Sequence, residues 1–250
     1  MIIKELDNFL KKKKIFQAKY IYIYSDFINF FNLCLNNKLV YLEKFLDLFL
    51  KRNITLIVPA YSYTAKNRFD VRKTASKVGF LANYIMRNKK FVRSYHPFFS
   101  YISIGPKSKI LRKLGKSAFG KQSIYSKLRK NNCYFFHLDR DLSLGNTLMH
   151  QIEKANKAKY RYEMIIKTKV YENNKYIGTN FSAFMRKNIN SKYHLSYFRR
   201  AGKLLKKKRY IYKTSIKGIK IFAYEFDKIF DDLSNMYKKD NEIFISKKDQ

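Results

Sequence analysis

Three short runs of almost unbroken apolar residues constrain the fold of this chain more than any other feature. Residues 18–24, 54–58 and 132–138 are rich in aromatic and β-branched side chains, which favour β-strands. Runs without polar alternation are typical of strands buried on both faces, as in sheets covered by helices on each side. A segment with apolar positions at helical spacing, residues 39–50, separates the first two runs. We therefore expect parallel strands joined by a right-handed crossover.

The rest of the chain continues the same α/β pattern without a linker or an internal repeat. Its 250 residues fit one domain. We expect a first helix before residue 18, a second helix that ends at residue 86 and a strand over 101–105. We also expect a helix over 107–114 and another that ends at residue 128. In the C-terminal part we expect hairpins over 164–177 and 209–222, helices around 181–185, 198–208 and 226–236, and a last strand over 242–245.

The strongest candidate site lies between Gly145 and Glu153, where a helix is expected to begin after the third apolar run. Asn146 or Thr147 can serve as the N-cap, because their side-chain oxygens accept free amide hydrogens of the first turn. His150 then lies near the positive end of the helix dipole, and Glu153 shares its face at i+3. Open α/β sheets place chemistry at such helix entrances. We predict that His150 and Glu153 are catalytic; a hydrogen-bonded packing histidine is the open alternative.

The charge balance points to anionic ligands without defining them. The chain has 54 Lys and Arg against 18 Asp and Glu, a formal net charge of +36. Such a charge attracts polyanions and phosphates. The lysines are spread along the whole chain beside many Ile, Asn, Tyr and Phe, a composition also typical of A/T-rich coding sequence. This composition is the favoured source of the charge, so no specific nucleic-acid partner is expected. A basic enzyme with phosphate-bearing ligands and a nucleic-acid-binding protein stay open as alternatives.

Composition argues against a secreted or membrane-spanning protein. Cys34 and Cys133 are too few and too isolated for a disulfide framework or a zinc site, and no metal is expected. An amphipathic segment precedes the lysines at 11–14, the reverse of the order in a signal peptide. No run of 18 apolar residues occurs. We expect a cytoplasmic protein.

Five segments, in this order, resemble the aminoglycoside 3-N-acetyltransferase family. They are the Pro-x-aromatic-Ser segment at 58–63, the Arg-Ser-Tyr-His-Pro stretch at 93–97 with Ser100 and Gly105-Pro106 after it, the serine-containing loop at 117–123, the Asn-Thr-x-x-His-x-x-Glu segment at 146–153, and the aromatic-Arg pair Tyr160-Arg161. The resemblance covers nearly the whole chain at compatible spacing.

The resemblance implies a three-layer α/β/α fold with a mixed, partly parallel central sheet and a C-terminal elaboration of hairpins and helices. It implies one domain over 1–250, in which 1–160 carry the core sheet and catalytic loops and 161–250 form part of the acceptor side. The implied reaction is transfer of acetyl from acetyl-CoA to an amine of an aminoglycoside or related amino sugar. Whether the chain forms a homodimer stays open.

His150 falls on the catalytic histidine of the family. An amine attacks a thioester only as the free base, so an imidazole can take its proton. Because no nucleophile-elbow pattern is present, direct transfer is favoured over an acyl-enzyme. Ser94, Ser117 or Thr147 can stabilise the oxyanion. The residues expected to contact the co-substrate are Ser25, Ser62, Arg93, Ser94, His96, Ser117, Ser123, Asn146 and Thr147.

Each of these contacts has a structural alternative. Arg93 can bind a CoA phosphate or anchor a loop, and His96 can shape the loop that contains it. Ser25 and Ser123 can hydrogen-bond the pantetheine arm or cap helices.

One departure from the family puts the acceptor in doubt. The family carries acidic residues after the first C-terminal hairpin, where residues 179–186 of this chain contain none. A polycationic drug would meet a repulsive field here. Three alternatives follow: an acyltransferase of nucleotide-linked amino sugars in surface-polysaccharide synthesis, an acyltransferase with another donor or an alcohol acceptor, and a non-catalytic or nucleic-acid-binding homologue.

Overall fold

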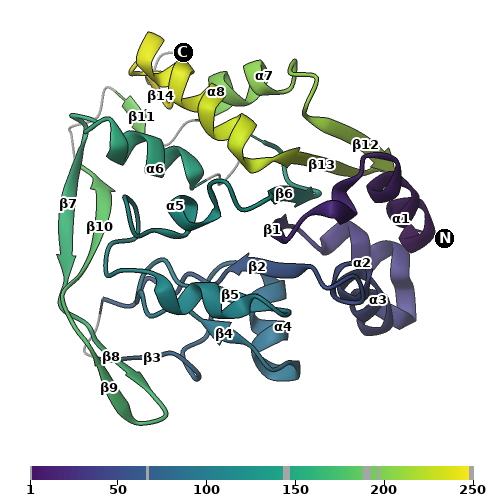
Figure 1. The fold of residues 1–250 in the computed structure, drawn as a ribbon, viewed down its shortest axis with the longest axis horizontal. Coiled ribbons are helices and arrows are strands. Elements are labelled where there is room, and N and C mark those ends of the chain that lie inside the picture. The colour runs from purple at the N-terminus through teal and green to yellow at the C-terminus, as the bar shows by residue number, and fades with distance from the viewer. Residues whose placement is uncertain (1, 66–67, 143–146, 188–192, 196–197, 248–250) are drawn as a thin grey trace.

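A seven-stranded mixed sheet runs through the centre of the molecule, as the computed structural model shows (Figure 1). The structure describes residues 2–65, 68–142, 147–187, 193–195 and 198–247. From one edge to the other, the strands are β12 (Tyr212–Ile216), β13 (Ile219–Glu225), β6 (Cys133–Leu138), β1 (Tyr20–Ser25), β2 (Thr55–Pro59), β5 (Tyr101–Ile104) and β4 (Val92–Arg93). The three apolar runs form the adjacent strands β6, β1 and β2, which are mutually parallel, so the predicted parallel core is confirmed.

Helices cover both faces of this sheet and complete three layers (Figure 1). One face packs against α1 (Ile2–Lys12), α2 (Ile28–Cys34), α3 (Lys38–Leu50) and α4 (Phe80–Asn88). The opposite face packs against α5 (Ile124–Leu128), α6 (Leu148–Ala155), α7 (Arg199–Leu205) and α8 (Phe226–Lys239). The predicted three-layer α/β/α fold is confirmed.

Strand β1 shows why two apolar cores are needed. Its tyrosines at 20, 22 and 24 belong to the core under α5, α6 and α8. Its isoleucines at 21 and 23 belong to the core under α1, α3 and α4. Successive side chains of a strand point to opposite faces, so a strand without polar alternation is stable only between two layers of helices.

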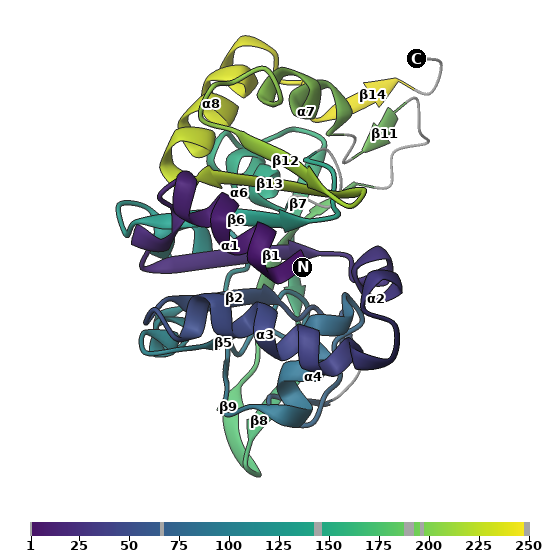
Figure 2. The same cartoon turned by 90° about the vertical axis from the view of Figure 1, so that its right-hand side faces the viewer.

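Smaller sheets and short 3-10 helices complete the chain. The smaller sheets contain β3 (Arg68–Asp70), β7 (Arg161–Ile166), β8 (Lys169–Glu172), β9 (Lys175–Gly178), β10 (Phe181–Arg186), β11 (Tyr193–Leu195) and β14 (Ile245–Lys247). The 3-10 helices are η1 (Ile15–Gln17), η2 (Leu35–Asn37) and η3 (Ser108–Lys113). The β8–β9 hairpin projects from the body of the molecule at the bottom of Figure 2.

Three expected elements differ from the structure. The helix expected around 181–185 is the strand β10, which pairs antiparallel with β7 over its whole length. Phe181 and Ala183 alternate inward along it, and pairing with a strand far away in sequence decides the conformation of a short apolar run. The helix expected over 107–114 is η3, a 3-10 helix. The hairpin over 164–177 is confined to β8 and β9, because β7 pairs with β10 instead.

Arg93, a predicted co-substrate contact, is completely buried at the end of β4. Its guanidinium donates to the carbonyl oxygens of Ala60 at 2.9 Å and Thr74, and its Nε donates to the Ser100 hydroxyl at 3.1 Å. Burial lowers the pKa of Arg93 to about 10. The side chain therefore connects the segments that follow β2, β3 and β4.

Removing this guanidinium should destabilise the fold. We expect Arg93→Ala to lower the free energy of unfolding by about 3 kcal/mol or more, because several buried acceptors lose a charged donor. Arg87→Ala is the matched control, since Arg87 is exposed near the end of α4 and surface changes usually stay within about 0.5 kcal/mol. Urea unfolding of both variants measures the difference. Equal stability of the two would contradict the anchoring role.

Candidate active site

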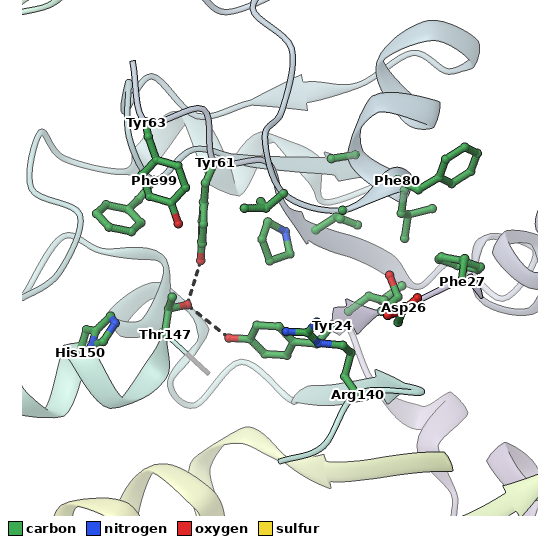
Figure 3. A pocket seen from close by; sticks show the side chains of 18 of the residues that line it. Tyr24, Asp26, Phe27, Tyr61, Tyr63, Phe80, Phe99, Arg140, Thr147 and His150 are labelled. Atoms are coloured by element: carbon green, nitrogen blue, oxygen red, sulfur yellow. Dashed lines mark hydrogen bonds between the residues drawn. The ribbon is translucent and has the colours of Figure 1, made fainter. Parts of the chain in front are cut away.

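A cavity of about 1030 Å³ opens beside the ends of β1 and β2 (Figure 3). The starts of α2, α4, α6 and β7, the end of β10 and nearby loop residues contribute the rest of its wall. Most of its lining is apolar or aromatic. The polar and charged residues that line it are Ser25, Asp26, Arg140, Thr147, His150, Arg161 and Arg186, together with the hydroxyls of Tyr24, Tyr61 and Tyr63.

His150 lines this cavity from the first turn of α6, and Glu153 lies behind it. The i, i+3 spacing places both side chains on one helix face, as the sequence predicted. His150 Nδ1 is 2.7 Å from Glu153 Oε2. Glu153 has no solvent-exposed surface, whereas the His150 side chain is 14% exposed. The carboxylate can therefore orient the ring while the ring faces the cavity.

Arg161, at the start of β7, completes this group. Its Nε lies 2.6 Å from Glu153 Oε2, and its Nη1 donates to the Phe184 carbonyl at 3.2 Å. Its Nη2 lies 2.8 Å from His150 Nδ1. Nδ1 can either donate to Glu153 or accept from Arg161, so only one of these two contacts is a hydrogen bond at any time. Arg161 was not among the predicted site residues, although the Tyr160-Arg161 pair was part of the family resemblance.

The surroundings of His150 keep its ring neutral. The ring lies between the rings of Phe119 and Phe198, with centroid distances of 5.6 Å and 5.5 Å. Burial lowers the pKa of His150, and the positive charge of Arg161 lowers it further, while Glu153 acts in the opposite direction. A neutral imidazole at neutral pH can accept a proton.

Thr147 does not cap α6 with its side chain. Its hydroxyl instead contacts the hydroxyls of Tyr61 at 2.8 Å and Tyr24 at 3.4 Å (Figure 3). It also contacts the Tyr125 hydroxyl. Burial raises the pKa of Tyr24 and Tyr125, so these hydroxyls stay protonated. Thr147, one of the two residues expected to cap α6, therefore does not do so with its side chain, because its hydroxyl contacts neighbouring tyrosines. Asn146 lies outside the described residues.

Ser25 is the other predicted co-substrate contact that lines the cavity, at the end of β1. Ser62 and Ser94 lie away from the cavity wall and hold the loops around residues 97–101. The Ser62 hydroxyl donates to the Pro97 carbonyl at 2.7 Å. Ser94 Oγ accepts from the Tyr101 amide at 2.9 Å.

His96 fixes the loop that contains it. Its Nδ1 accepts from the amides of Phe98 and Phe99 at 3.1 Å and 3.0 Å. Its Nε2 donates to the Ser182 carbonyl at 2.9 Å. Burial lowers the pKa of His96 to about 4, so the neutral ring makes these bonds at neutral pH.

Ser117 and Ser123 also serve local structure. Ser117 donates to the Phe119 carbonyl at 2.8 Å. Ser123 caps α5 and contacts Gln151 Oε1 at 3.0 Å. These two serines, Ser94 and His96 border a separate void of about 10 Å³, which holds no more than about one water.

Within the described residues, no group of three or more His, Cys, Asp or Glu side chains could hold a metal ion. In the same part of the chain, no helix combines the length and apolarity needed to cross a bilayer.

Comparison with known proteins identifies the family. A sequence model of the aminoglycoside 3-N-acetyltransferase family matches residues 44–238. The chain therefore belongs to this family of transferases, whose co-substrate is acetyl-CoA. No curated protein sequence matches the chain.

Solved structures share the fold at low sequence identity. The apoenzyme of aminoglycoside acetyltransferase AAC(3)-IVa is 17% identical with a TM-score of 0.70, covering 97% of this chain and 90% of its own. The AAC-IIIb complex with CoASH is 12% identical with a TM-score of 0.74, covering 95% and 96%. The YokD protein from Bacillus subtilis is 12% identical with a TM-score of 0.69, covering 94% of both chains.

The His150 ring should titrate below pH 6.5, the ordinary histidine value, because burial and Arg161 oppose its charged form. We expect its Cε1 proton at pH 6.5 to lie closer to the chemical shift of the neutral ring than to that of the charged ring in an NMR titration. Loss of the signal in His150→Ala identifies it. A titration midpoint at or above 6.5 would contradict the described environment.

Proposed function

We propose that the protein transfers acetyl from acetyl-CoA directly to an amino group of an aminoglycoside or a related amino sugar, with His150 as the general base. The observation that carries this proposal is the position of His150, which lines the large cavity while Glu153 holds its ring from behind. AAC(3)-IVa, a structural relative, has been solved as a histidine-to-alanine variant bound to gentamicin, which is consistent with a histidine acting in acetyl transfer.

The base must present a lone pair to the acceptor amine. We assign the ring proton to Nδ1, where it donates to Glu153 Oε2 in a charge-assisted bond. Arg161 keeps its ion pair with Glu153 and its hydrogen bond to the Phe184 carbonyl. Nε2 is then the unprotonated nitrogen, and it takes the proton of the amine as the new amide bond forms and the thiolate of CoA leaves.

Direct transfer agrees with the positions of the thiols. Neither Cys34 nor Cys133 lines the cavity, and burial raises the pKa of both thiols. A thiol with a raised pKa is a poor nucleophile because the thiolate is the reactive form.

Neutral hydroxyls are the proposed stabilisers of the tetrahedral oxyanion. Thr147 and Tyr61 line the cavity, and Thr147, the N-cap residue of α6, lies three residues before His150. Fixed O–H donors favour negative charge that develops in a site with little water. Ser94 and Ser117, the other predicted donors, are engaged away from the cavity.

The cavity also suits the co-substrate. Its volume and apolar lining fit a pantetheine arm, with Ser25 and Thr147 as the predicted contacts that face it.

Both parts of the chain contribute to the cavity. Residues 1–160 supply the ends of the central strands and His150. The part from 161 to 250 supplies Arg161, β10 residues and Phe198, which form the proposed acceptor side.

Removing the base should slow turnover without abolishing binding. We expect His150→Ala to lower kcat by roughly 10²–10⁴-fold, in an assay of thiol release from acetyl-CoA with amino-sugar acceptors, and to leave calorimetric acetyl-CoA binding within about twofold. Lys154→Ala is the control, because Lys154 follows on the same helix but pairs with Glu163 at the surface. Full activity of His150→Ala would show that this histidine is not the base. Glu153→Gln is a poorer test, since it leaves Arg161 without its buried carboxylate.

A further inference from the structure

The wall of the cavity carries more positive than negative charge. Three arginines line it, Arg140, Arg161 and Arg186, against one carboxylate, Asp26. Glu153 compensates Arg161. Among the described residues, no carboxylate lies within ion-pair distance of Arg140 or Arg186. The neighbouring segments outside the described part, 143–146 and 188–192, contain no Asp or Glu.

Arg186 lies on the His150 side of the cavity because of strand register. It is the direct cross-strand partner of Arg161 in the β7–β10 ladder, and directly opposed side chains project from the same face of a sheet. Arg161 reaches His150 Nδ1 at 2.8 Å. The exposed Arg186 therefore stands beside the group that contacts the proposed base.

Two like charges directly opposite each other are unfavourable in a ladder. One carboxylate, Glu153, lies in this group, and it is buried against Arg161 and His150. A dianionic group bound between the cavity and Arg186 would reduce the repulsion between the charges of Arg161 and Arg186. A polycationic acceptor would increase it, in a chain whose formal net charge is already +36.

We infer that the acceptor is an amino sugar that carries a phosphate group, and that Arg186 binds this phosphate while the amine lies at His150. This inference rests on the proposed acetyl transfer and names its substrate class. A simple sugar phosphate and a nucleotide-linked amino sugar present the same chemistry to the guanidinium.

Calorimetry on the protein saturated with CoA measures acceptor binding alone, because the residues that bind the CoA phosphates are then already occupied. The titrated probes are glucosamine, glucosamine 6-phosphate, a uridine-diphosphate-linked amino sugar and kanamycin. We expect one of the two phosphate-bearing sugars to bind about tenfold or more tightly than glucosamine, the effect of one charge-assisted hydrogen bond. Whichever of the two binds better identifies the source of the phosphate.

Arg186→Gln should remove this preference and leave the affinity for CoA unchanged. Lys187→Gln is the matched control, because it removes the same charge at the next residue, which does not line the cavity; it should keep the preference. Three results would overturn the inference: equal binding of glucosamine and both phosphates, tightest binding of kanamycin, or an Arg186→Gln effect on CoA affinity alone. The thiol-release assay with His150→Ala tests the proposed reaction separately, so the two failures are distinguishable.

Discussion

The buried ion pair between Glu153 and Arg161 is the interaction on which the candidate site depends. A carboxylate without solvent contact is costly unless a cation and hydrogen bonds compensate it. Arg161 supplies the cation at 2.6 Å, and His150 meets the same oxygen. The pair joins α6, which covers one face of the seven-stranded sheet, to β7 of the separate two-stranded sheet. The orientation of His150 is therefore set by two elements at once, neither of which fixes it alone.

This connection also gives the C-terminal part of the chain its role. The β7–β10 sheet places Arg161 behind the histidine, and the end of β10 lines the cavity in front of it. A single antiparallel register thus positions the support of the proposed base and the wall that faces the acceptor. Arg161 and Arg186 can act together in the site because the β7–β10 pairing places them opposite each other.

The sequence predicted the parts of the fold that local pattern determines. Apolar runs defined β1, β2 and β6, and the spacing of His150 and Glu153 defined a shared helix face. Strand β10 was expected as a helix, because Phe181 to Met185 is short and its partner β7 is distant in sequence. The Arg161–Glu153 contact required that same pairing, and so could not be inferred from spacing.

Polar loop residues were the least predictable, because a serine that caps a helix and a serine that contacts a ligand look alike in sequence. Ser62, Ser94 and Ser123 are occupied by local hydrogen bonds, whereas Ser25 faces the cavity. The tyrosine hydroxyls around Thr147 were not predicted as site residues. Tyr24 lies on β1, Tyr61 lies in the loop after β2, and Tyr125 lies on α5. Their hydroxyls meet because α5 packs against this face of the sheet.

We propose above all that Glu153 fixes His150 with its proton on Nδ1 and an unprotonated Nε2 toward the cavity. The ¹⁵N chemical shifts of His150 in histidine-labelled protein, measured at neutral pH with CoA bound, test this tautomer most directly. We predict a protonated Nδ1 and an unprotonated Nε2. A protonated Nε2, with Nδ1 accepting from Arg161, would leave the ring without a base on the cavity side and would contradict the proposed role of His150.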